Sequence, residues 1–148
     1  MIQKCYFALG CFWHAQEEFD KVKGVVKTTV GYSGGKTSNP TYSEVGTGKT
    51  GHAETIEIEF DDTIVSYENL LDIFWRIHDP TTLNRQGADI GTNYRSIIFY
   101  LNNEQKIIAE KSKKEMQENF KDKIVTEIVP FEKFYRAEEY HQKYYMKN

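Results

Sequence analysis

The sequence predicts an α+β fold: a two-layer α/β sandwich with a ferredoxin-like split βαβ core and a largely antiparallel sheet. The first observation is the spacing of the apolar residues, which predicts strands and helices in the order β-α-β-β-α-β-α-β along the chain. The second is a pair of long segments rich in turn residues, 33–51 and 81–94, which are longer than ordinary connections. The third is the length of 148 residues, which fits one domain, 1–148, able to bury a core without disulfides or metal.

The first half of the chain contains three expected strands and one helix. The side chains of residues 3–9 are expected to alternate between two faces, with Cys5, Phe7 and Leu9 on one of them, as in a strand. Residues 11–22 carry apolar side chains at helical spacing, and Gly24 ends this helix. Residues 25–32 are rich in β-branched side chains and residues 55–60 alternate again, so both segments are expected to be strands.

The second half adds helices and strands in alternation. Ser66 is placed to cap a helix that ends before Asp79-Pro80. Residues 96–101 are nearly all apolar, which predicts a central strand covered on both faces. A charged helix from residue 103 to about residue 120, a strand at 124–129 and a short helix at 137–145 complete the chain.

Composition and charge favour a cytoplasmic protein with no nucleic-acid or membrane partner. The formal net charge is -3, and charges of both signs are mixed along the chain, which gives no argument for binding nucleic acid. No apolar run is long enough to span a membrane, and the N-terminus lacks the layout of a signal peptide. The four histidines show no metal-ligand spacing, and residues 46–50 lack both the leading glycine and the following helix of a phosphate-binding loop. No bound metal or other cofactor is therefore expected.

Cys11 is the main candidate for a catalytic residue, because it follows a strand and Gly10 and begins a helix. A thiol at a helix N-terminus lies near backbone N–H groups, which favour the nucleophilic thiolate. Phe12 and Trp13 follow at once and indicate an apolar pocket. The alternative is a buried structural cysteine, which is the commoner role of a lone cysteine.

Cys5 is expected to be a core residue rather than a disulfide partner of Cys11. Strand residues between the two sulfurs span roughly 20 Å at ~3.3 Å per residue. A disulfide needs Cα atoms within about 7 Å, so the strand would have to unravel.

The two long loops also offer polar side chains, so we expect them to be extended active-site loops that meet near the end of the first strand. Glu54 follows the first loop and shares the parity of Ile56 and Ile58, the buried face of its strand. A carboxylate at the rim of an apolar face should have a raised pKa, which suits a proton donor. The alternative is an exposed strand glutamate. Tyr42 lies in the first loop, and Tyr94 leads out of the second, where a tyrosine is more often a packing residue.

Several blocks along the chain resemble, in order, the A-type peptide methionine sulfoxide reductases (MsrA). Blocks in order over nearly the whole chain are far more specific than any one motif. The blocks are Gly10–Trp13, Gly31–Gly35, Asn39–Val45, Gly51–Glu54, Phe74–Trp75, His78–Pro80, Arg85–Gly87, Asp89, Gly91–Ser96, Phe134–Tyr135, Ala137–Glu138 and Tyr140–Gln142.

The resemblance implies reduction of the S epimer of methionine sulfoxide, free or in peptides and proteins, and so repair of oxidised methionine. By analogy, Cys11 would be the nucleophile and would end as a sulfenic acid. Glu54 would protonate the sulfoxide oxygen, and Tyr42 and Tyr94 would donate hydrogen bonds to it, where charge develops.

The resemblance also implies a set of substrate-binding residues. Phe12 and Trp13 would form an apolar pocket for the substrate methyl group, and its handedness would select one epimer. Asp89 and His52 match positions that line the site and would shape the substrate contacts.

The sequence departs from many relatives in its cysteines. Those relatives carry further cysteines, often near the C-terminus, which attack the sulfenic acid and pass a disulfide to thioredoxin. No cysteine follows Cys11 here. We therefore predict a one-cysteine enzyme regenerated by an external thiol: thioredoxin, glutathione with glutaredoxin, or another small thiol.

Two other functions remain as alternatives. One is a non-catalytic module that binds oxidised methionine, and the other is a peroxide sensor in which Cys11 is oxidised directly. Glu54 and the two tyrosines argue against the binding module, because a binder needs no acid.

Overall fold

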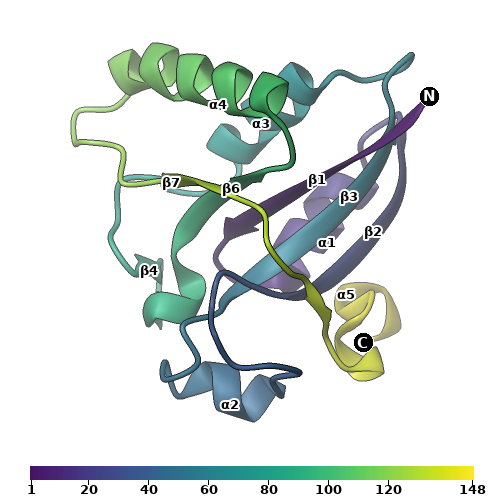
Figure 1. The fold of residues 1–148 in the computed structure, drawn as a ribbon, viewed down its shortest axis with the longest axis vertical. Coiled ribbons are helices and arrows are strands. Elements are labelled where there is room, and N and C mark those ends of the chain that lie inside the picture. Colours follow the sequence, from purple (N-terminus) through teal and green to yellow (C-terminus); the bar gives the residue numbers. More distant parts are fainter.

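A six-stranded sheet forms the centre of the structure, with strand order β7-β6-β1-β3-β2-β8 (Figure 1). The strands are β1 (Ile2–Leu9), β2 (Val25–Ser33), β3 (Ala53–Asp61), β6 (Ser96–Tyr100), β7 (Glu127–Pro130) and β8 (Tyr135–Arg136). Only β6 and β7 pair in parallel. This computed structural model describes residues 1–148 and confirms the predicted α+β fold with a largely antiparallel sheet.

Three helices pack on one face of the sheet: α1 (Phe12–Asp20), α3 (Tyr67–Arg76) and α4 (Asn103–Met116). Figure 1 shows α1 behind the strands and α3 and α4 along one edge. Ser66 caps the N-terminus of α3 as expected, since its side chain accepts a hydrogen bond from the N–H of Asn69. The buried core on this face includes Cys5, Phe7 and Leu9, which confirms the predicted parity of the first strand.

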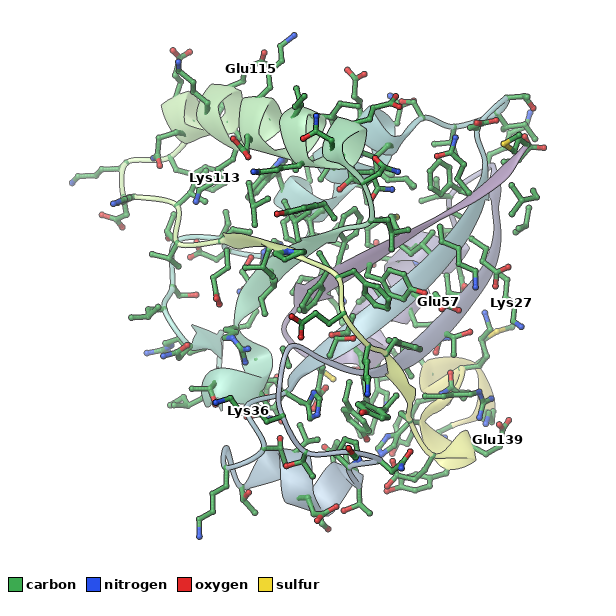
Figure 2. The ribbon with its side chains drawn as sticks, viewed as in Figure 1. Lys27, Lys36, Glu57, Lys113, Glu115 and Glu139 are labelled. Carbon is green, nitrogen blue, oxygen red and sulfur yellow. The ribbon has the colours of Figure 1, made fainter.

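The opposite face of the sheet is covered by the chain between β7 and β8. Because these two strands form the two edges, their connection crosses the sheet, in front of β1 and β3 in Figure 1. Phe131 stacks on Tyr6 with ring centroids 4.1 Å apart. The Tyr6 hydroxyl also donates to Glu57 of β3 over 2.6 Å, and Figure 2 labels Glu57 in the middle of the sheet. Both faces of β1 are therefore buried near its end.

The two long loops contain short elements that the sequence periodicity did not predict. The first includes α2 (Tyr42–Gly46), which begins with a capping box between Thr41 and Glu44. The second includes the hairpin of β4 (Arg85–Gln86) and β5 (Asp89–Ile90), followed by a 3-10 turn at Thr92–Tyr94. A Thr-x-x-Glu signal was present in the sequence, but one helical turn is too short for an apolar stripe.

Two predicted strands are present but differ from the prediction, one in its place in the sheet and one in its bounds. Residues 96–100 are paired on both sides and buried from Ser96 to Phe99, but β6 lies next to the edge strand β7, while β1 and β3 are central. The strand expected at 124–129 is found at Glu127–Pro130, because the N–H of Val125 bonds instead to the carbonyl of Pro80.

The predicted C-terminal helix at 137–145 is wrong. The segment forms a 3-10 turn at Glu139–His141 and a separate helix, α5 (Tyr144–Lys147), with Lys143 between them at φ 57°. The Gln142 side chain accepts from the N–H of Val30 and donates to its carbonyl. These two bonds fix Gln142 to β2 and prevent a continuous helix through this residue. None of the helices has the length and apolar character needed to cross a membrane.

Candidate active site

Cys11 lies at the junction of β1 and α1, as the N-cap residue of the helix. The backbone N–H groups of Trp13 and His14 lower the pKa of its thiol, as expected at a helix start. Burial, and after it the charge of Glu54, act more strongly in the other direction and raise this pKa to about 11. The helix start favours the thiolate, as expected, but desolvation outweighs the effect of the two N–H groups. Cys11 is a thiol at neutral pH.

Gly10 brings the second long loop against the nucleophile. Its φ is +99°, and a Cβ at this position would lie 2.8 Å from Cγ of Gln86. Gln86 in turn bonds the backbone N–H and carbonyl of Asp79, both over 2.8 Å. A glycine is needed before Cys11 because of both its backbone conformation and this close approach.

Glu54 is buried beside Cys11, with 2% of its surface exposed. Its Oε1 accepts a hydrogen bond from the backbone N–H of Phe12 over 3.1 Å. Burial raises the pKa of the carboxyl to about 8, against the opposing effect of the Phe12 N–H. The predicted buried parity and raised pKa are confirmed, and the carboxyl is mostly protonated at pH 7.

Tyr42 and Tyr94 come from different loops and meet near the two reactive groups. Burial raises the pKa of both hydroxyls, and the charges of Glu54 and Cys11 raise it further. An interaction with Tyr94 also contributes at Tyr42. The backbone N–H of Tyr42 donates to Oε2 of Glu138 over 3.0 Å, which fixes α2 to the C-terminal segment.

Phe12 and Trp13 have different surroundings. Phe12 is 1% exposed, and its ring packs against Tyr42 with centroids 6.4 Å apart, so it lies in the floor of the site. Trp13 is half-buried, its Nε1–H donates to Nδ1 of His141 over 3.0 Å, and its ring stacks on Tyr144 at 3.7 Å.

His141 and Tyr144 were missed as site residues by sequence reasoning. Both lie in the segment whose helix prediction is wrong, and periodicity gave them no role. The only available signal was the block Tyr140–Gln142, which the resemblance did not assign to any function. The structure places them against Trp13.

Asp89 and His52 are both near the site but differ in what they offer. Asp89 is exposed on β5, close enough to raise the pKa of Cys11, Glu54 and Tyr94. His52 is buried, and both ring nitrogens bond backbone groups: Nδ1 accepts from Gly35 over 3.0 Å and Nε2 meets the carbonyl of Thr37 at 2.7 Å. His52 therefore anchors the first loop and has no free polar atom to offer a substrate.

Cys5 is fully buried in the core, and both cysteines are free thiols. It pairs with Ile58 across the sheet, and burial raises its pKa well above the usual range. The prediction that Cys5 is a core residue is confirmed. Cys11 is thus the one thiol within the active site.

The site combines a thiol, a protonated carboxyl and two phenols above an aromatic floor. This set can attack an electrophilic atom while protonating an oxygen bound to it. No group of three or more His, Cys, Asp or Glu side chains gathers around a point where a metal ion would bind.

Comparison of the sequence with known families gives a match over residues 3–148 to the family described as peptide methionine sulfoxide reductase. Among curated proteins, the chain is 58% identical to "Peptide methionine sulfoxide reductase MsrA" of Methanosarcina acetivorans. That match covers 99% of this chain and 79% of the relative.

Comparison of the structure with solved structures gives the same group of proteins. Reduced Mxr1 from Saccharomyces cerevisiae aligns with a TM-score of 0.95 and 37% identity, over 99% of this chain and 86% of that chain. Mxr1 in complex with Trx2 aligns with a TM-score of 0.71 and 28% identity, over 97% and 84% of the two chains.

Proposed function

Since the chain belongs to the peptide methionine sulfoxide reductase family and is an enzyme of that activity, we propose that it reduces the S epimer of methionine sulfoxide through Cys11. The substrate is methionine sulfoxide, free or in peptides and proteins, and the result is repair of oxidised methionine. The observation that carries the proposal is the hydrogen bond from the Phe12 N–H to Glu54, which holds a protonated acid beside the thiol.

The reaction moves one oxygen atom and two electrons. The sulfur of Cys11 attacks the sulfoxide sulfur, and Glu54 gives its proton to the sulfoxide oxygen. The thiol proton passes to Glu54 and restores its carboxyl. The sulfur–sulfur bond formed by this attack and the substrate sulfur–oxygen bond then break as the protonated oxygen moves to the sulfur of Cys11. Methionine leaves, and Cys11 is left as a sulfenic acid.

Four aromatic residues orient the substrate for this step. Tyr42 and Tyr94 donate hydrogen bonds to the sulfoxide oxygen as negative charge develops there. Phe12 and Trp13 hold the substrate methyl group on their rings, which leaves one epimer with its oxygen facing Glu54. Asp89 lies at the rim of the site, and His52 acts through the loop that carries Tyr42.

Regeneration of Cys11 is assigned to an external thiol. Within the 148 residues the only other cysteine is Cys5, which is buried in the core. Two external thiols convert the sulfenic acid to the thiol, with release of water and formation of their own disulfide. A thioredoxin is one source, supported by the similar Mxr1 chain in complex with Trx2, and glutathione with glutaredoxin is another.

A reductant panel with a single substrate epimer tests the proposal. The S epimer should be turned over with at least one of thioredoxin, glutaredoxin with glutathione, and dithiothreitol. The R epimer should not react, and Cys11→Ser should be inactive. Activity on the R epimer alone, or full activity in Cys11→Ser, would contradict the proposed function.

A further inference from the structure

A cavity of about 310 Å³ lies between α1 and the C-terminal segment that contains α5. Trp13 and Glu17 line it from α1, and Tyr144, Tyr145 and Met146 line it from α5. Figure 2 marks this end of the molecule with Glu139, far from Glu115 on α4. Of the residues assigned to the reaction, only Trp13 lines this cavity.

The cavity and the active site have one aromatic residue in common. Trp13, which is two residues from the nucleophile, borders both, and Tyr144 stacks on its ring at an interplanar angle of 7°. Tyr145 also lines the cavity and lies edge-on to the Trp13 ring, with ring centroids 6.2 Å apart.

The charged groups of the cavity are neutralised except for one. Asp20 pairs with Lys143 over 2.7 Å, and Lys21 pairs with Glu18 at 3.7 Å. Glu17 is exposed and takes part in no ion pair. One free carboxylate thus lies beside the tyrosine and tryptophan rings.

Aromatic faces beside a free carboxylate suit a side chain with an apolar stem and a cationic end. A lysine or arginine packs its methylene groups on the rings and places its charge near the carboxylate and the ring faces. An acidic side chain at the same place is repelled.

We propose that this cavity is a second substrate subsite, which binds a lysine or arginine next to the oxidised methionine of a peptide. The inference rests on the proposed function and specifies its preferred peptide class. Free methionine sulfoxide has no flanking side chain and does not use the subsite.

Peptides of the form acetyl-X-Met(O)-X-amide test the subsite, with the S sulfoxide and X as lysine, leucine or glutamate. At low ionic strength kcat/KM should rank lysine above leucine above glutamate, with lysine about fivefold above glutamate and the difference mainly in KM. The ratio should shrink in high salt, because exposed charges are screened. Leucine ranking first, or a flat ranking, overturns the proposal.

Two variants provide a matched comparison. Glu17→Gln should bring the lysine-to-glutamate ratio close to one. Glu110→Gln makes the same charge change at an exposed position of α4, outside the cavity lining, and should preserve the ratio. Equal ratios in the two variants overturn the proposal. Failure of the wild-type protein to reduce free S sulfoxide would instead contradict the proposed function, so the two failures are distinguishable.

Discussion

The backbone N–H of Phe12 donates a hydrogen bond to Oε1 of Glu54 over 3.1 Å, between residues that are 42 positions apart. This buried contact places the acid beside the nucleophile and lowers the pKa of its carboxyl, while burial raises it more, to about 8. Glu54 is therefore both held in place and mostly protonated at neutral pH.

Glu54→Gln should lose most of the reduction rate and still bind substrate. The amide retains an oxygen for the Phe12 N–H but gives no proton to the sulfoxide. General acid catalysis contributes roughly 10²- to 10⁴-fold, so kcat should fall by that order. Single-turnover formation of sulfenic acid measures the effect.

Glu59→Gln is the matched control for this variant. It makes the same change on the same strand, at a half-buried position of the opposite parity. Its rate should equal that of the wild type, and unchanged turnover in Glu54→Gln would remove Glu54 from the acid role.

The rate of sulfenic acid formation should fall as pH rises through about 8. The proposed step uses the carboxyl proton of Glu54 and the thiol proton of Cys11, and with pKa values of about 8 and about 11 the carboxyl proton is lost first. Single-turnover rates from pH 6 to 10 at saturating substrate check this. A rate that increases with pH up to 8 would show that the thiolate, not the thiol, attacks.

Glu54 should also make the stability of the protein depend on pH. Its carboxyl has an ordinary pKa of 4.5 and a folded pKa of about 8. The stabilising effect of the proton is complete below pH 4.5 and is lost as pH rises to about 8, by up to roughly 5 kcal/mol. Urea unfolding at pH 5 and pH 8 should show a larger loss for the wild type than for Glu54→Gln, and equal losses would contradict the raised pKa.

His141→Phe should weaken substrate binding through Trp13. The variant removes the acceptor of the Trp13 Nε1–H, whose bond measures 3.0 Å, and keeps an aromatic ring at the site. The loss of one such bond costs about 1 kcal/mol, so KM should rise about fivefold with a smaller change in kcat. Trp13→Phe combined with His141→Phe should be no worse than Trp13→Phe alone, whereas additive effects would argue against the contact.

Turnover should modify Cys11 and leave Cys5 as a thiol. Cys5 is fully buried and pairs with Ile58 inside the sheet, so the sulfenic acid cannot reach it without opening β1. Mass spectrometry after one turnover without reductant, with a sulfenic-acid trap, should find the label on Cys11. Cys5→Ala should retain turnover with dithiothreitol, and a Cys5–Cys11 disulfide as the main oxidised species would contradict the one-cysteine reaction.

Sequence reasoning was most successful where the signal is local. Alternation in residues 3–9 and 55–60 predicted two strands and put Glu54 on a buried face, because side-chain direction in a strand depends only on parity. It failed at residues 137–145, where Gln142 bonds Val30 of a distant strand and prevents a continuous helix.

By itself, the sequence determined the order of the long strands and helices, the glycine before the nucleophile, the buried parity of the acid and the resemblance to a family. Only the tertiary structure decided that Trp13 rests on His141, 128 residues away, and that burial keeps Cys11 a thiol although it lies at a helix start. The physical reason is that long-range contacts and desolvation depend on how separate elements pack. No local pattern records the burial that raises the pKa of Cys11.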